Sequence, residues 1–188
     1  MKLYIWRHPK PVAAKGICLG QTDMTVDRRK LKRLANQIER FACVHKLPKV
    51  IWVSPLQRSL KVGEILAQRG FQLNMASELS ELNFGAWDGQ AWQHISKHEI
   101  DEWCDHFADF NFETGESLTQ LFTRVEHWLK TRAHDDEPIL AVGHGGWINA
   151  AKMLVNNQPI PQLASDWQSA AAYGELSTLE FITITANG

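Results

Sequence analysis

The chain has 188 residues, of which 44% are hydrophobic and 22% are charged, and its formal net charge is −1. This length is enough for one well-packed domain and marginal for two. A net charge near zero provides no overall field that would attract nucleic acid or an acidic membrane, so anion binding has to come from a local cluster of side chains.

The first part of the chain predicts two strand–helix units and a further strand. An unbroken apolar run at residues 3–6 indicates a strand, and residues 27–43 carry apolar residues at helical spacing. A second apolar run at residues 50–53 is followed by a helical pattern over residues 57–69, and residues 71–75 are expected to form another strand. Apolar runs without alternation are typical of strands that are covered on both faces.

The later part continues this alternation after an irregular stretch. Residues 83–113 are rich in Trp, Phe, His and acids without clean periodicity, and are expected to form a helical excursion or a lid over one end of the sheet. We predict a helix over residues 116–133, a strand at residues 139–142 and a helix at residues 147–155. Residues 177–185 alternate clearly, which favours a half-exposed, antiparallel edge strand.

These elements predict a single α/β domain over residues 1–188. Strands that alternate with helices are typical of a three-layer sandwich with a mostly parallel central sheet. Three widely spaced cysteines form no CxxC pair, which favours a reducing compartment. The apolar run near the N-terminus is too short for a signal peptide, and no run approaches the roughly 20 residues of a membrane helix. We therefore expect a cytoplasmic protein with neither a membrane nor a nucleic-acid partner.

Charged side chains follow each of the three strong strands. Arg7 and His8 come directly after the first, Arg58 follows the second and His144 follows the third. The carboxyl ends of parallel strands meet at one edge of a sheet, where open α/β sheets bind their ligands. Two guanidinium groups and two imidazoles suit a phosphoryl group, because arginine matches phosphate oxygens and histidine can act as a nucleophile. The order of the strands does not follow from the sequence, so this convergence is an expectation.

Four sequence fragments extend this pattern in a fixed order. They read LYIWRH at residues 3–8, SPLQRS at 54–59, LSELNFGAWDG at 79–89 and VGHGG at 142–146. Each fragment alone is moderate evidence. The ordered set resembles the histidine phosphatase superfamily, also called the phosphoglycerate mutase-like proteins.

The resemblance implies a role for each matching residue. His8 would be the nucleophile that becomes phosphohistidine, while Arg7, Arg58 and His144 would hold the phosphoryl oxygens and stabilise the transition state. Glu81 would protonate the leaving alcohol and then act as the base for water. The family's chemistry needs neither a metal nor another cofactor, and the expected partner is a small phosphorylated substrate.

One residue departs from the family pattern. Pro9 stands where glycine usually follows the first histidine. Proline has no backbone N–H, so this position loses a donor that could cradle phosphate, whereas the imidazole of His8 is untouched. We expect the departure to affect the choice of substrate more than catalysis.

The resemblance also favours one branch of the family. The loop GICLGQTD at residues 16–23 and the GES sequence at 115–117, followed by Arg124, are similar to the alpha-ribazole phosphatases, which act on a nucleotide-like precursor in cobalamin assembly. Mutases of the family usually have a longer excursion between the residues that correspond to Glu81 and His144. We therefore favour a phosphatase for alpha-ribazole 5′-phosphate. The alternatives are a phosphatase for another sugar or nucleotide, and phosphoglycerate mutase-type phosphoryl transfer.

Five further residues are candidate substrate contacts: Gln21, Thr22, Trp87, Ser117 and Gly145. The polar side chains could equally make hydrogen bonds within loops, and Trp87 could stack on a substrate ring or lie in the core. Gly145 belongs to a glycine-rich turn that is either only a tight connection or also a donor of backbone N–H groups to an anion.

Three competing hypotheses carry less weight. His94 and His98 have a spacing that can bind zinc, but the HExxH motif is absent and a solvated helix face is favoured. The basic run at residues 28–33 could contact nucleic acid or another polyanion, but it is interpreted as the solvent-exposed face of an amphipathic helix. A pseudo-enzyme that only binds phosphate is a remote alternative, because the predicted catalytic set is intact.

Overall fold

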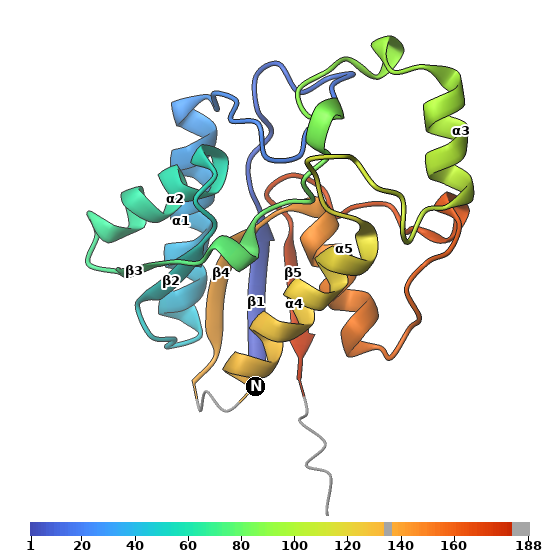
Figure 1. Cartoon of the computed structure of the whole chain (residues 1–188). Coiled ribbons are helices and arrows are strands. Elements are labelled where there is room, and N and C mark those ends of the chain that lie inside the picture. Colours follow the sequence, from blue (N-terminus) through green and yellow to red (C-terminus); the bar gives the residue numbers. More distant parts are fainter. Residues whose placement is uncertain (134–136, 182–188) are drawn as a thin grey trace, which may run out of the picture.

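A five-stranded sheet forms the centre of the computed structural model (Figure 1), which describes residues 1–133 and 137–181. The strand order is β3-β2-β4-β1-β5. The first four strands in this order are parallel to their neighbours, and β5 pairs antiparallel with β1 at the edge. This confirms the predicted sheet; the end of the predicted edge strand lies outside the described residues. The strands are β1 (Lys2–Arg7), β2 (Val50–Val53), β3 (Gln72–Met75), β4 (Ile139–Gly143) and β5 (Leu176–Glu180).

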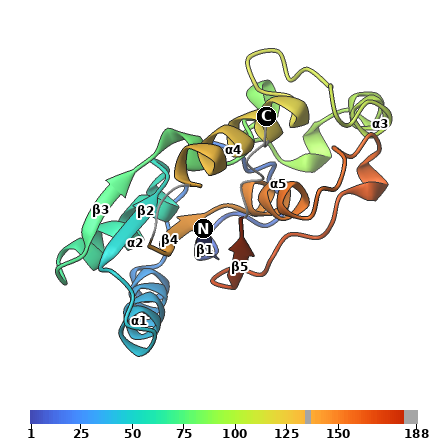
Figure 2. The same cartoon turned by 90° about the horizontal axis from the view of Figure 1, so that it is seen from below.

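Helices cover both faces of the sheet, as the predicted three-layer sandwich requires. Figure 2 shows α1 (Arg28–Val44) on one side and α4 (Leu118–Arg132) with α5 (Gly145–Val155) on the other. Helix α2 (Gln57–Ala67) packs beside α1. Within the part of the chain that the structure describes, no helix is both long and apolar enough to cross a membrane.

The first residue of two of these helices is set by a capping residue in one case and by a glycine pair in the other. Ser117 precedes α4 and forms a capping box with Gln120, so the helix starts two residues later than predicted. Helix α5 starts at Gly145, two residues earlier than predicted, because the glycine pair after His144 forms its first turn. Both shifts are within the usual uncertainty of helix ends.

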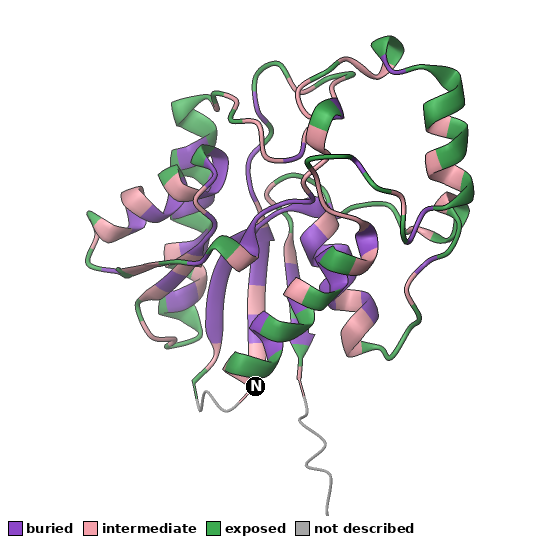
Figure 3. Ribbon diagram, in the orientation of Figure 1, coloured by how far each residue is buried: buried purple, intermediate pink, exposed green. Residues whose placement is uncertain are grey.

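The hydrophobic core lies in two layers, one on each face of the sheet. Leu3 and Ile5 of β1 point toward α4 and α5, whereas Trp6 points toward α1. All five residues of β4 are buried, and Figure 3 shows this strand buried along its length while the outward faces of α1 and α4 are exposed. Burial on both faces explains why the central strands read as unbroken apolar runs.

The irregular segment 83–113 is a helical excursion built on contacts between aromatic rings. Its regular part is α3 (Lys97–Asp105), which stands at the outer edge of the molecule in Figure 1. The rings of Trp92 and Trp103 are stacked, with centroids 5.9 Å apart and planes 14° apart. Such contacts depend on tertiary packing and leave no periodicity in the sequence. Movement of this segment as a lid stays a prediction. The short 3-10 turns are η1 (Ser77–Leu79), η2 (Gly85–Trp87), η3 (Trp92–His94) and η4 (Ala164–Asp166).

Candidate active site

Three neighbouring strands deliver polar side chains to one end of the sheet. The register of β1 with β4 pairs Arg7 with Gly143, so His8 and His144 follow at the same level on adjacent strands. Ser54 follows β2, which lies on the other side of β4. The structure therefore brings the two histidines together as the sequence pattern predicts.

His8 is buried and its ring is held in one tautomer. Its Nδ1 lies 2.9 Å from the carbonyl oxygen of Pro9, which can only accept, so Nδ1 carries the proton. The lone pair on Nε2 accepts a hydrogen bond from Nε of Arg58 at 3.3 Å. Burial and the charges of Arg58 and Arg7 lower the pKa of His8 well below its ordinary value. The result is a neutral imidazole with a lone pair available for nucleophilic attack.

Two buried nitrogen atoms close to His8 have no hydrogen-bond partner among the described residues. They are Nδ1 of His144, whose ring centroid lies 4.9 Å from that of His8, and Nε of Arg7. Elsewhere on the same side chains, Nε2 of His144 lies 2.7 Å from the Ser54 hydroxyl and Nη1 of Arg7 donates to the Ala171 carbonyl at 2.7 Å. Buried polar atoms are nearly always paired. These two nitrogens therefore indicate a binding place for a ligand with acceptor oxygens.

Arg58 is fully buried and connects His8 to the loop that follows β1. Besides its hydrogen bond to His8, it donates to the carbonyl oxygens of Gly20 and Thr22, the latter at 3.0 Å. The carboxylate of Asp88 holds the same loop by accepting backbone N–H groups of Gly20 and Thr22, both at 3.1 Å, and of Gln21. Asp88 thus fixes the loop whose carbonyl groups hold the guanidinium group of Arg58.

The carboxylate of Glu81 lies at the N-terminus of α5. Its oxygens accept backbone N–H groups of Gly146 at 3.1 Å and Trp147 at 3.3 Å. A Cβ atom on Gly146 would lie 2.5 Å from Oε1 of Glu81, and one on Gly145 would lie 3.1 Å from the guanidinium carbon of Arg7. The glycine pair therefore lets two charged side chains approach the start of this helix closely.

Arg124 of α4 holds the segment that carries Glu81. Its guanidinium group donates to the carbonyl oxygens of Glu78 at 2.6 Å and Ser80 at 2.9 Å. The same group forms an ion pair with Glu116 at 2.5 Å. Several hydrogen bonds to one short segment restrict its movement, so the Glu81 carboxyl group is fixed from the side of α4 as well as α5.

A cavity of about 270 Å³ lies against this cluster. Its polar lining side chains are Arg7, His8, Glu81 and Tyr173, and its other lining side chains are aliphatic or aromatic. The Tyr173 ring lies over the Arg7 guanidinium at 3.9 Å and meets the His8 ring edge-on. A neutral nucleophile, an arginine with an unpaired Nε and a carboxyl group thus border one space, and these groups together can carry out phosphoryl transfer from a phosphate ester.

Comparison with known families agrees with this chemistry. The sequence matches the profile of the histidine phosphatase superfamily (branch 1) over residues 3–183. The chain belongs to this superfamily. A relative is the 6-phosphofructo-2-kinase/fructose-2,6-bisphosphatase of Arabidopsis thaliana, which is 23% identical over 150 residues that cover 77% of the chain and 20% of that protein. The chain spans from 20% to 48% of the length of the curated relatives it matches.

Solved structures of similar proteins share the fold of this histidine phosphatase superfamily member. Bacillus stearothermophilus YhfR superimposes with a TM-score of 0.81 at 18% identity, over 97% of the chain and 92% of that structure. The alpha-ribazole phosphatase from Shigella flexneri gives a TM-score of 0.77 at 20% identity, again over 97% and 92%. The α/β fold and the family predicted from the sequence are therefore confirmed.

Four of the five predicted substrate contacts do not line the cavity. The backbone of Gln21 and Thr22 serves the Arg58 and Asp88 contacts, and the Gln21 side chain donates to the Glu81 carbonyl at 3.0 Å. Ser117 caps α4. Of the predicted set, only Gly145 lies in the lining, together with its neighbour Gly146.

Trp87 is the clearest difference between the predicted contacts and the structure. It is buried among other rings, with its centroid 5.1 Å from that of Phe112, because the edge-to-face packing of the excursion draws it inward. The tryptophans that line the cavity are Trp92, Trp103 and Trp167. The many aromatic residues of the excursion indicate a contact region, but they do not show which rings face the cavity. Nothing in the sequence around Tyr173 predicts that this residue lines the cavity.

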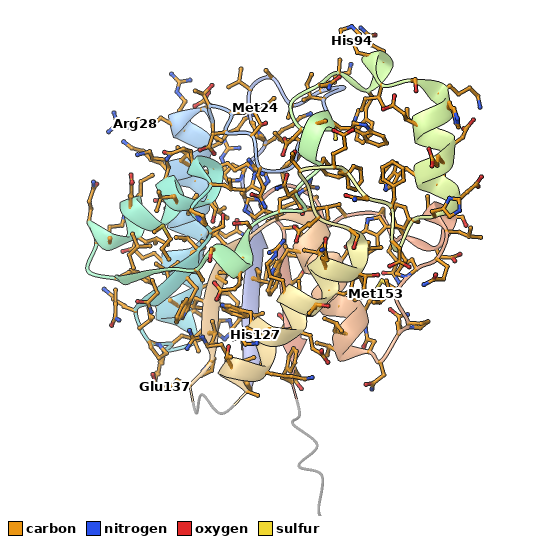
Figure 4. The ribbon with its side chains drawn as sticks, in the orientation of Figure 1. Met24, Arg28, His94, His127, Glu137 and Met153 are labelled. Carbon is orange, nitrogen blue, oxygen red and sulfur yellow. The ribbon has the colours of Figure 1, made fainter. Side chains whose placement is uncertain are left out.

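The competing sites suggested by the sequence lie away from this cluster. Figure 4 places His94 at the outer tip of the excursion and Arg28 on the outside of α1, and both are exposed. His98 is exposed as well. Among residues 1–133 and 137–181, no group of three His, Cys, Asp or Glu side chains is placed to hold a metal ion.

Replacement of Asp88 tests the contacts behind Arg58. Asp88→Asn should lower kcat/KM by about 100-fold, because an amide offers one acceptor to three N–H groups and lets the loop and Arg58 shift. Turnover of 4-nitrophenyl phosphate and the melting temperature should be measured together. Asp88→Glu should recover part of the rate, and Asp101→Asn on exposed α3 is the matched control. A rate within twofold of the wild type for Asp88→Asn would contradict this role.

Two buried, neutral histidines should make the fold sensitive to acid. Burial, with the charge of Arg58, lowers the pKa of both His8 and His144 well below 6.5. Since both regain a pKa of about 6.5 on unfolding, the unfolded state binds the extra protons as the pH falls. The stability that these neutral histidines contribute is present above about pH 6.5 and is lost as the pH falls below it. The free energy of unfolding then decreases by up to about 1.4 kcal/mol per pH unit for each histidine. Urea unfolding between about pH 7.5 and pH 5.5 measures this decline, and a flat profile would refute it.

Proposed function

We propose that the chain hydrolyses small phosphomonoesters through a phosphohistidine on His8, with alpha-ribazole 5′-phosphate as its substrate. The observation that carries the proposal is the state of His8, a neutral imidazole in the cavity lining whose proton is held by Pro9. The unpaired nitrogens of Arg7 and His144 are suited to bind the phosphoryl oxygens. Pro9 retains its carbonyl group, so the departure from the family's glycine leaves this tautomer in place.

In the first step Nε2 of His8 attacks phosphorus while the bond from phosphorus to the alcohol oxygen breaks. Glu81, in its protonated form, gives its proton to the departing alcohol. The guanidinium group of Arg58 exchanges its contact with Nε2 for a phosphoryl oxygen. Together with Arg7 and His144 it stabilises the charge that develops on the phosphoryl group.

In the second step a water molecule attacks the phosphorus of phosphohistidine. The Glu81 carboxylate takes a proton from this water, and the bond from phosphorus to Nε2 breaks. Inorganic phosphate leaves, and His8 regains its lone pair. Glu81 is again protonated for the next cycle, so atoms and protons balance over the two steps.

The apolar lining of the cavity supports an alcohol with a ring system. Alpha-ribazole carries a benzimidazole, a flat aromatic group, next to its ribose. Aromatic side chains bind such rings by stacking and edge contacts. A solved structure of an alpha-ribazole phosphatase from Shigella flexneri has the same fold, which is compatible with this substrate.

The test is phosphate release from a panel of monoesters, with a strong chelator present and His8→Ala measured alongside. The panel contains alpha-ribazole 5′-phosphate, sugar phosphates, nucleotides and phosphoglycerates. Selective, His8-dependent release from alpha-ribazole 5′-phosphate supports the whole proposal. Release from other monoesters keeps the mechanism and discards this substrate. Isomerised phosphoglycerate would indicate a mutase, and no reaction with any compound would leave only phosphate binding.

A further inference from the structure

The cavity lining divides into side chains that the reaction uses and side chains that it does not. The phosphoryl group and the proton transfer account for Arg7, His8 and Glu81, and Tyr173 packs on the first two. Apart from the indole N–H groups of its tryptophans, the rest of the lining offers no charged or polar side-chain group from any residue that the structure describes. Five of these apolar side chains are aromatic: Phe84, Trp92, Trp103, Phe107 and Trp167.

This lining favours an apolar alcohol over a hydroxylated or charged one. Hydroxyl or carboxylate groups would lose water at these walls and find only the indole N–H donors of Trp92, Trp103 and Trp167 in its place, which is unfavourable for groups that make several hydrogen bonds. An apolar ring has no such loss and gains by leaving water. The cavity volume of about 270 Å³ is the volume that roughly nine water molecules occupy in the liquid, so the cavity has room for one ring system.

These five side chains form an aromatic wall whose rings pack against one another. Trp103 of α3 is stacked on Trp92, and the Phe84 ring stands at 84° to Trp92 and 83° to Trp103. The Phe107 ring lies 5.2 Å from that of Trp103. A capping box at Ser96 fixes the start of α3. A wall that is ordered before the ligand arrives loses little entropy on binding.

We infer that this wall selects phosphomonoesters whose alcohol carries a flat aromatic ring, and that Trp103 is a specificity-determining residue. The inference rests on the proposed function and goes beyond it, because it covers aryl-bearing alcohols as a class. Trp103 is half-buried, lines the cavity and meets five other rings, so it is both accessible to a ligand and held in place by its neighbours. Simple sugar phosphates and phosphoglycerates, which carry no ring of this kind, are poor substrates on this basis.

A pair of substrates with similar leaving groups tests the preference for alcohols that carry an aromatic ring. 2-Phenylethyl phosphate and 2-hydroxyethyl phosphate both release a primary alcohol, so both need the acid to a similar degree. The wild-type kcat/KM should favour the phenyl compound by about 100-fold or more. Equal or reversed preference, with turnover that still depends on His8, would overturn the inference and leave the proposed function standing. No turnover of these or of 4-nitrophenyl phosphate would remove both.

Variants of the aromatic wall test whether Trp103 determines specificity. Trp103→Ala should lower this preference by about 10-fold or more, mainly through a higher KM for the phenyl compound. Trp103→Phe keeps a ring and should recover most of the preference. The matched control is Phe110→Ala, because Phe110 packs in the same excursion against Trp87 without lining the cavity. An unchanged preference in Trp103→Ala, or an equal drop in Phe110→Ala, would contradict the assignment.

An inhibition experiment needs no variant and so does not depend on the fold of a mutant. Phenylphosphonate and methylphosphonate present the same anionic group to the phosphoryl site and differ only in the group that would enter the cavity. Phenylphosphonate should inhibit the wild type about 10-fold more tightly or better. Equal inhibition constants would overturn the aromatic preference even where turnover is too slow to compare.

Discussion

His8→Ala should lower turnover of every phosphomonoester by at least about 10⁴-fold, because the covalent route is lost together with the nucleophile. Arg7, Arg58 and His144 would remain and would still bind phosphate. Binding of inorganic phosphate, measured by calorimetry, should therefore survive in the variant. The wild type should in addition yield a phosphorylated His8 peptide after an alkaline quench, which mass spectrometry can locate.

The interpretation of His8→Ala depends on an intact fold. The His8 side chain is buried at the end of β1, and it belongs to neither hydrophobic core layer. The circular dichroism spectrum should be unchanged. His127→Ala is the matched control, because Figure 4 shows His127 on α4, away from the catalytic end of the sheet, and it is exposed. Near-normal turnover by a folded His8→Ala protein would exclude the phosphohistidine mechanism.

Glu81→Gln should slow the reaction according to how much the leaving group needs a proton. For an alkyl phosphate, whose alkoxide is a poor leaving group, kcat should fall by about 10²- to 10⁴-fold. For 4-nitrophenyl phosphate the loss in the first step should be small, because nitrophenolate leaves without protonation. The ratio of the two losses, measured on one protein preparation, reports the acid role directly.

Structural effects of Glu81→Gln have to be separated from its chemistry. The carboxylate accepts backbone N–H groups from Leu82, Gly146 and Trp147. An amide would place its NH2 group against one of them, at a cost of about 1–3 kcal/mol in stability. A fall in melting temperature is therefore expected, and a single-turnover burst with 4-nitrophenyl phosphate shows whether the first step survives. Equal losses on both substrates in the first step, measured under single-turnover conditions, would argue against Glu81 as the acid.

The sequence was most informative where chemistry is tied to strand ends. Arg7, His8 and His144 follow apolar runs directly, so the register of two parallel strands was enough to bring them together. The adjacency of β1, β4 and β2 was not available from the pattern, because the strand order depends on crossovers that a local window does not record. Glu81 was found only through the family resemblance, since its partner Gly146 is far away in the sequence.

The walls of the cavity could not be predicted in the same way. Trp87 and Trp103 lie in the same irregular segment and look alike in the sequence, yet one is enclosed by rings and the other faces the cavity. Tyr173 comes from the connection before β5, which has little regular structure and no motif. Which of several aromatic residues faces a ligand depends on three-dimensional contacts among them, and spacing along the chain does not encode those contacts.

The separation between the sheet and the excursion has an evolutionary consequence. The groups for phosphoryl chemistry stand at strand and helix ends, whereas residues 90–113 contribute Trp92, Trp103 and Phe107 in one continuous stretch that leaves out Asp88. A graft of this stretch from another member of the superfamily would exchange much of the ring-binding wall without touching the nucleophile or its arginines. The reaction and the substrate range can thus change independently in this architecture.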